Sequence, residues 1–248
     1  MNINFIGVTD EVYEDFPAPY SSNTQVPSWY NEMPNYTNDK KTIGIDGNPN
    51  STIKRCVPFR DAMFAGYMIP VPYDLDFRQD SRNLTITKSY QGKYDVISNH
   101  TADQYFMYPI PPEYNSKVLK WNNPWVMKTP KGWSTLFVTP THRNLPFQIF
   151  TGIVDTDKYT ESVNLPFIVR KDFNGILEKG TPFVQCIPIK RKNHYAIATE
   201  NSTNMFKKWR QATTQAFDRY RDFFHVPKKY KMLDNSDKKC PFSKLFNK

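Results

Sequence analysis

The chain has 248 residues and a formal net charge of +9, and 15% of its residues are aromatic. This length can bury a sizeable hydrophobic core, and three widely spaced cysteines argue against a disulfide scaffold or a zinc ribbon. No apolar run reaches the roughly 18 residues of a membrane span, and early acidic residues argue against a signal peptide, so we expect no membrane contact and a location in a cytosol or inside a particle.

The balance of proline, glycine and aromatic residues favours β structure. The 20 Pro residues would interrupt long helices, whereas aromatic and β-branched side chains suit pleated surfaces. We therefore expect a folded, mainly β protein with three parts, divided as residues 1–55, 56–191 and 192–248.

Residues 1–55 are polar and rich in Asn and Pro, and we expect them to form an extended N-terminal arm. The aromatic residues along this segment suggest that it packs on the body of the same chain or on a neighbouring subunit, rather than forming a free tail. A loosely docked N-terminus is the alternative. The aromatic residues concerned are Tyr13, Phe16, Tyr20, Trp29, Tyr30 and Tyr36.

Residues 56–191 are predicted to form a β-rich body. Short apolar or alternating runs of strand length follow one another, separated by Pro and Gly and without helical segments between them. Such spacing predicts a distorted antiparallel barrel or sandwich. The predicted strand runs are residues 66–72, 84–90, 93–98, 134–140, 147–155, 163–169 and 181–190.

Residues 192–248 are expected to form a basic C-terminal helix and tail. From Lys190 to the C-terminus there are 15 Lys and Arg but only 5 Asp and Glu, so the positive charge of the whole chain arises here. Three- and four-residue spacing predicts an amphipathic helix over residues 203–224, with an aromatic face that packs in the core or on another subunit. That face comprises Phe206, Trp209, Ala216, Phe217, Tyr220 and Phe224.

The basic residues of this C-terminal part attract polyanions through long-range Coulomb forces and counterion release. We therefore predict a polyanion-binding surface, with nucleic acid as one such partner. A contact with another protein subunit and a simply solvated tail are the alternatives. The predicted residues are Lys207, Lys208, Arg210, Lys228, Lys229 and Lys231.

The most specific pattern in the chain lies between residues 152 and 191. It opens with Gly-Ile-Val-Asp-Thr-Asp at residues 152–157 and continues to Gly180 and Gln185, which lead into an apolar run. This order resembles the trimeric deoxyuridine triphosphate pyrophosphatase (dUTPase) and dCTP deaminase superfamily. With weaker matches at residues 61–70 and 129–134, the resemblance covers residues 60–191 and implies a β-clip body that forms a homo-oligomer, a trimer being usual in the family.

The dUTPase resemblance also implies roles for single residues. Asp155 would orient or deprotonate the water that attacks the α-phosphate of a nucleotide, while Mg²⁺ holds the triphosphate. Tyr159 would stack under the deoxyribose. The other nucleotide-binding residues implied by the matched motifs are Asp157, Gln185, Lys131 and Ser134.

Several departures from the family pattern argue against catalysis. Lys131 and Ser134 stand where the family has an Arg-Ser pair that grips phosphate. Lys158 displaces Tyr159 by one position from the place of the family's Tyr. A shift of one residue in a strand turns the side chain to the opposite face of the sheet unless a β-bulge restores the register. No glycine follows Gly180, so a glycine-rich closing arm is missing. Asp-Thr-Asp is also typical of a turn in which Asp side chains bond to nearby backbone.

A second set of segments resembles a family of uncharacterised proteins of tailed phages that infect marine bacteria. The segments are Cys-Val-Pro-Phe-Arg-Asp-Ala-Met at 56–63, Asn-Pro-Trp at 123–125, Gly-Trp-Ser at 132–134 and the run at 182–191. The many Asn, Lys and Tyr residues suit an AT-rich genome. This resemblance implies a viral origin and a location in the virion or the host cytoplasm.

Two main hypotheses follow. The first is a non-catalytic structural or binding protein of a tailed phage, which contacts itself or other virion proteins through a dUTPase-like body and a basic C-terminal part, without a cofactor. The alternative is a divergent Mg²⁺-dependent deoxynucleoside triphosphate pyrophosphatase or nucleotide-binding regulator with Asp155 as its base. A nucleic-acid-binding accessory protein is a third reading. The four histidines share no metal-ligand spacing, so no metal site is predicted from them.

Overall fold

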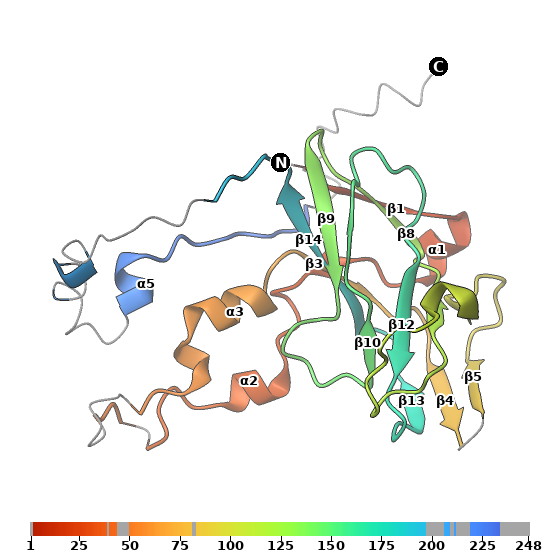
Figure 1. Ribbon diagram of the computed structural model, residues 1–248, viewed down its shortest axis with the longest axis horizontal. Coiled ribbons are helices and arrows are strands. Elements are labelled where there is room, and N and C mark those ends of the chain that lie inside the picture. The colour runs from red at the N-terminus through yellow and green to blue at the C-terminus, as the bar shows by residue number, and fades with distance from the viewer. Residues whose placement is uncertain are drawn as a thin grey trace.

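The structure, a computed structural model, describes residues 2–38, 40–43, 50–80, 83–196, 206–208, 211 and 219–233. Strands prevail over helices, and they form several antiparallel sheets that do not close into a barrel (Figure 1). The predicted mainly β, antiparallel class is therefore confirmed.

The central sheet contains five strands in the order β11-β9-β14-β3-β2. Its longest strand, β14 (Pro182–Lys190), lies in the middle of the sheet and pairs with a neighbour on each side. The register with β9 runs from Gln185 opposite Val138 to Lys190 opposite Trp133. The other four strands are β2 (Tyr20–Ser21), β3 (Tyr67–Pro70), β9 (Trp133–Val138) and β11 (Gly152–Val154).

Three smaller antiparallel sheets complete the body. The four-stranded one has the order β10 (Phe147–Ile149), β12 (Leu165–Val169), β7 (Leu119–Trp121) and β6 (Ile97–Asn99). The three-stranded one has the order β13 (Gly175–Leu177), β4 (Leu75–Gln79) and β5 (Leu84–Lys88). A pair is formed by β1 (Asn4–Gly7) and β8 (Trp125–Lys128).

The core lies between the central sheet and the four-stranded sheet, and it is built from aromatic rings. Phe183 of β14 is fully buried and stacks on Trp121 of β7 with ring centroids 3.8 Å apart. Phe147 of β10 stacks on the Phe183 ring at 4.4 Å, and Phe167 of β12 packs edge-to-face with Phe183 at 5.1 Å. Large flat side chains on alternating strand positions thus hold the two layers together, as their area and ring geometry favour.

The N-terminal residues pack on the body of the same chain, one of the two placements expected for their aromatic side chains. Helix α1 (Asp10–Asp15) begins at Thr9, whose hydroxyl accepts a hydrogen bond from the Val12 amide at 3.4 Å. Val12 and Phe16 are part of the core, and β1 extends β8. The segment contains strands and helices, so it is not extended throughout. The division at residues 55 and 56 stays a prediction.

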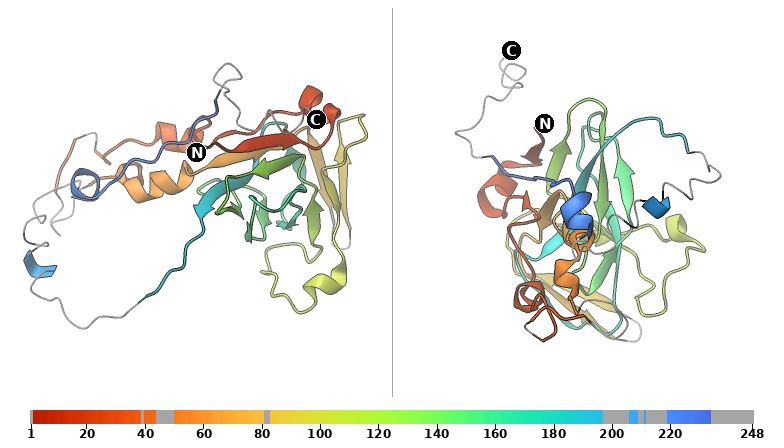
Figure 2. Two further views of the ribbon diagram at one scale, coloured as in Figure 1. Left: turned by 90° about the horizontal axis from the view of Figure 1, so that it is seen from above. Right: turned by 90° about the vertical axis from the view of Figure 1, so that its left-hand side faces the viewer.

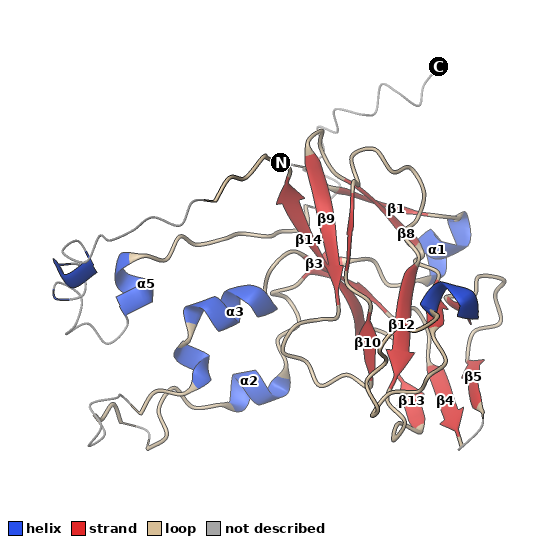
Figure 3. Ribbon diagram, in the orientation of Figure 1, coloured by secondary structure: helices blue, strands red, loops and turns tan. Residues whose placement is uncertain are grey.

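Helices α2 and α3 lie on one side of the strands, and α1 lies on the other (Figure 3). Helix α2 (Ser28–Glu32) contacts α3 (Val57–Met63) through edge-to-face ring pairs, Trp29 with Phe59 and Tyr30 with Phe64. Two single 3-10 turns, η1 (Ile53–Arg55) and η2 (Ala102–Tyr105), complete the described helical elements of the body. Helix α3 leads directly into β3 and so positions the edge of the central sheet.

The C-terminal part leaves the end of β14 and extends away from the strands, as two views show (Figure 2). Much of the helix predicted over residues 203–224 lies outside the described residues, including Trp209, Ala216 and Phe217. Within the described part, residues 206–208 are helical and α5 covers Arg219–Phe223. Phe206, Tyr220 and Phe224 are exposed, so they do not pack in the core of this chain. The alternative, a contact of the aromatic face with another subunit, stays a prediction.

Each predicted strand run contains an observed strand, but the boundaries differ. The run at 147–155 gives two strands in different sheets, because β10 pairs with β12 whereas β11 pairs with β9. Strands β1, β2, β4, β7, β8 and β13 fall outside the predicted runs. Most of them are only two to five residues long, too short for a periodic pattern to identify.

Candidate functional site

The Asp-Thr-Asp segment forms a tight turn directly after β11. The carbonyl oxygen of Asp155 accepts hydrogen bonds from the amides of Lys158 and Tyr159, both at 2.8 Å. Thr156 points inward, and its hydroxyl lies 2.8 Å from those of Thr129 and Thr135. The two aspartates that flank Thr156 lie near the start of β9, where Asp155 contacts the Ser134 hydroxyl and Asp157 contacts the Gly132 amide.

Arg191 joins the two aspartates into one cluster. It follows β14 immediately, and its amide donates to the carbonyl of Gly132 at 2.8 Å, which continues the pairing of β14 with β9. One guanidinium nitrogen lies 3.0 Å from Asp155 Oδ1 and 2.8 Å from Asp157 Oδ1, and the second contacts Asp157 Oδ2. A planar guanidinium that spans two carboxylates gives a fixed, oriented contact.

Backbone and hydroxyl groups complete the Arg191 cluster. Ser134 Oγ donates to Asp155 Oδ1 at 2.7 Å, and the Gly132 amide donates to Asp157 Oδ2 at 2.8 Å. Arg191 also donates to the Trp133 carbonyl at 3.0 Å. The Asp157 side chain is 4% exposed, whereas that of Asp155 is 51% exposed. Asp157 is therefore the inner member of the cluster and Asp155 the outer one.

The charges of the cluster stabilise one another. The hydrogen bond from Arg191 holds the pKa of Asp157 well below its ordinary range. The hydrogen bond from Ser134 and the nearby Arg191 charge lower the pKa of Asp155 in spite of desolvation. The hydrogen bond to Asp157 raises the pKa of Arg191. Both aspartates are thus ionised at neutral pH, and a carboxylate of lowered pKa is a weak general base there.

Replacing Arg191 by Gln is expected to lower the melting temperature at pH 7 and to flatten its dependence on acid pH. Asp157 has a depressed pKa in the folded state, so its contribution to stability is present above the ordinary carboxyl pKa of about 4 and is lost as the pH falls through the folded-state pKa. Melting curves measured from pH 7 to pH 2 test this. The control is Arg170→Gln, which removes a similar pair with Asp172 whose side chains are 41% and 66% exposed. Equal curves for the two variants would contradict the role of Arg191.

Gln185, expected to bind nucleotide, lies fully buried and away from Asp155. It is opposite Val138, whereas Ser134 of the cluster is opposite Ile189, a separation of about 13 Å at roughly 3.3 Å per residue. Its side-chain oxygen accepts from the amide and hydroxyl of Thr141, at 2.9 and 3.0 Å. Its side-chain nitrogen donates to the carbonyls of Ala62 and Ala65, at 2.9 and 2.7 Å. All four hydrogen-bonding positions of the amide are occupied within the protein.

The structure places the other predicted nucleotide-binding residues as follows. Asp155, Asp157 and Ser134 lie together, and Lys131 is exposed in the turn next to Gly132. Tyr159 is exposed beyond the turn, and its carbonyl accepts from Lys128 Nζ at 2.6 Å. Gln185 is not part of this group. Arg191 was missed as a site residue, although its position at the end of the apolar run next to the basic segment marked the junction.

The predicted polyanion-binding residues divide into two groups. Lys207, Lys208, Lys229 and Lys231 are exposed, while Arg210 lies outside the described residues. Lys228 is engaged with the body, because its ammonium lies 2.6 Å from Asp61 Oδ2. Burial opposes the ionisation of Asp61, but hydrogen bonds from Lys228 and His225 outweigh it and lower its pKa. Lys228 therefore helps to hold the residues that follow α5 against α3.

Residues 225–233, here named the C-terminal strap, return along α3 and the edge of the central sheet. His225 Nε2 lies 3.1 Å from Asp61, and Ser21 Oγ of β2 donates to the Tyr230 carbonyl at 2.7 Å. The Tyr230 ring meets the edge of Tyr67 on β3 at 6.1 Å. The strap thus fixes residues 225–233 to the same body that contains β14.

Two further properties of the described residues concern a metal site and a membrane-spanning helix. Among the described residues, no group of three or more His, Cys, Asp and Glu side chains is placed to hold a metal ion. No helix in the described ranges combines the length and apolar character needed to cross a membrane.

Comparison with known proteins adds no family to these observations. The chain matches no known protein family and no curated protein at a significant level, so the two resemblances stay predictions.

Proposed function

We propose that this chain is a non-catalytic assembly protein. Its β body serves as a rigid platform, and its C-terminal part makes contact with a second copy of the chain. The dUTPase-like β-clip character of the body and the origin in a tailed phage are parts of the same proposal. They rest on the sequence resemblances alone.

The observation that carries the proposal is the exposure of several large apolar side chains at described positions of the C-terminal part. Tyr195 is 89% exposed, and further along the chain Phe223, Phe224 and Val226 are 59%, 55% and 72% exposed. Single exposed apolar residues are ordinary, but a group of them on one projecting segment is typical of a protein contact surface. Aromatic side chains are also the residues that most often dominate binding energy at such contacts.

The geometry of the Arg191 cluster favours this proposal over nucleotide hydrolysis. The charge of Asp155 is balanced by Arg191 at 3.0 Å, and its lowered pKa weakens it as a base. Gln185 is engaged on all sides and distant from Asp155. The cluster instead fixes the point at which the C-terminal part leaves the body, which suits a segment that has to present a contact surface in a defined place.

Replacing both Phe223 and Phe224 by Ser is expected to weaken self-association of the full-length protein at least tenfold. Loss of two buried aromatic contacts at an interface typically costs more than the 1.4 kcal/mol that equals a tenfold change. Sedimentation equilibrium over a range of protein concentrations measures the association constant, and circular dichroism verifies that the variant stays folded.

A matched control is the double variant Phe106→Ser with Met107→Ser. These side chains are 82% and 85% exposed, and they lie beside η2, at the other end of the molecule from α5 (Figure 2). The association constant should change little in this variant. A wild-type protein that stays monomeric at every concentration would contradict the proposed self-assembly, as would a control that weakens association equally.

A further inference from the structure

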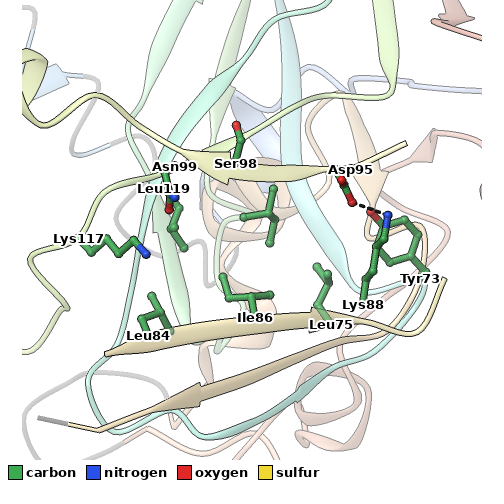
Figure 4. Close-up of a pocket in the computed structure, with 11 residues that line it drawn as sticks. Tyr73, Leu75, Leu84, Ile86, Lys88, Asp95, Ser98, Asn99, Lys117 and Leu119 are labelled. Atoms are coloured by element: carbon green, nitrogen blue, oxygen red, sulfur yellow. Dashed lines mark ion pairs between the residues drawn. The ribbon is translucent and has the colours of Figure 1, made fainter. Parts of the chain in front are cut away.

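A pocket of about 350 Å³ lies on the opposite side of the body from the strap, where the three-stranded and four-stranded sheets face each other (Figure 4). Among the strands of the described ranges, β5 pairs only with β4 and β6 only with β7, so the two layers are not joined here. Leu84 and Ile86 of β5 point toward β6 across the opening. The open margin of the sandwich therefore forms a slot that is lined by both apolar and polar side chains.

The slot has the form of a binding site for a small elongated ligand. The apolar side chains that line it are those of Leu75, Leu84, Ile86, Ile97 and Leu119. Alternate residues of β5 from Leu84 to Lys88 line it, a length of about 13 Å at roughly 3.3 Å per residue. Its volume is at the lower end of the range of about 300–1,000 Å³ that is usual for ligand pockets. The space thus suits a single short hydrocarbon chain.

The two ends of the slot differ in charge. At one end the Lys88 ammonium is paired with Asp95 Oδ1 at 2.5 Å and also donates to the Gly92 carbonyl at 3.1 Å. Tyr73 at this end donates to the Tyr94 carbonyl at 3.0 Å and accepts from the Val96 amide at 3.0 Å. This end is therefore electrically balanced, and its polar groups are already satisfied.

At the other end, Lys117 reaches toward the slot beside Leu84 and Leu119. Its backbone amide donates to Asn115 Oδ1, and within the described part of the chain its ammonium has no ion-pair or hydrogen-bond partner. An ammonium at the rim of the slot can bind a carboxylate through a charge-assisted hydrogen bond. The side-chain amide of Asn99, beside it, adds a further donor.

We propose that this slot binds a monoanionic amphiphile with one short acyl chain, of the fatty carboxylate class. The carboxylate lies at Lys117 and the hydrocarbon chain extends between β5 and β6 toward the Lys88–Asp95 pair. The orientation follows from the charges, because the far end offers no unpaired cation. This proposal is independent of the assembly function, since the slot shares no residue with the C-terminal part.

Octanoate is the probe for the test, and isothermal titration calorimetry on the full-length protein is the measurement. We expect saturable binding of one octanoate per chain, weakened about tenfold or more by Lys117→Gln, because this variant removes the charge-assisted hydrogen bond to the carboxylate. Ile97→Glu, which places a negative charge in the slot wall, should abolish binding. Octyltrimethylammonium, of opposite charge, should not bind.

The matched control is Lys120→Gln. Lys120 lies on β7 next to Leu119, and its side chain points to the opposite face of that strand, so this variant removes the same charge without touching the slot. Its affinity for octanoate should equal that of the wild type. The proposal is overturned if octanoate does not bind, if octyltrimethylammonium binds equally well, or if Lys120→Gln weakens binding as much as Lys117→Gln. Thermal melting of each variant separates loss of binding from loss of folding.

Discussion

Replacing Gln185 by Ala is expected to lower the free energy of unfolding by about 3 kcal/mol. The side chain is fully buried in β14, and it connects the end of α3 with the Thr141 turn. Ala leaves a cavity and removes the acceptor of the part-buried Thr141 amide, and a group left without its partner in a buried place costs about 1–3 kcal/mol. Urea denaturation, evaluated by linear extrapolation, measures the change.

Two further variants separate the causes of the Gln185 effect. Gln185→Leu nearly preserves the volume but not the hydrogen bonds, so it should retain part of the loss. Gln148→Ala changes the same residue type at an exposed position of β10 and should alter stability by less than about 0.5 kcal/mol. If Gln185→Ala leaves stability unchanged but abolishes binding of a nucleotide, the structural role assigned to Gln185 is wrong and the nucleotide-binding role is restored.

Replacing Gly66 by Ala should be nearly as damaging, with an expected loss of about 3 kcal/mol. Gly66 precedes β3 and has φ +68°, in the left-handed region that L residues avoid. A Cβ atom there would lie 2.0 Å from the carbonyl oxygen of Cys186 on β14. Backbone strain of about 1–2 kcal/mol therefore adds to an overlap that the central strand cannot relieve without moving.

Two other glycines provide a graded control series, measured by the same urea denaturation. Gly180 has φ +87° but open space around its Cα, so Gly180→Ala should cost only the backbone strain, about 1 kcal/mol. Gly152 has neither a positive φ nor a close neighbour, and Gly152→Ala should change stability by less than about 0.5 kcal/mol. A loss at Gly66 no greater than that at Gly180 would show that the contact with Cys186 is not tight.

The class of the fold could be predicted from the sequence, because it depends on local patterns. Alternating runs such as residues 84–90 and 181–190 identify strands through their own periodicity. The partners of those strands depend on contacts between distant residues, so the division of residues 147–155 between two sheets was not predictable from the run itself. The packing of Phe16 on the body was among the expectations, whereas the incorporation of Val12 into the core was hidden by its polar surroundings.

The candidate site was predicted in part for the same reason. Asp155, Asp157 and Ser134 were named from a linear motif, and the pairing of β11 with β9 brings them together. Arg191 joins them because β14 ends beside the start of β9, a consequence of sheet order that no local pattern encodes. Gln185 was assigned outward to a ligand, yet the register of β14 turns it inward. Burial of a polar side chain depends on partners that only the tertiary structure supplies.

The position of β14 has a mechanical consequence. A pulling force on the residues between Arg191 and the strap is shared by the strap contacts and β14. On the β14 side it reaches Arg191 and then passes along the axis of a strand that is hydrogen-bonded to β3 on one side and β9 on the other. Load applied along such a strand shears many hydrogen bonds together, whereas an edge strand can be peeled away one bond at a time. The C-terminal part is thus attached where the body best resists tension, and stress from a neighbouring molecule is spread over the whole central sheet.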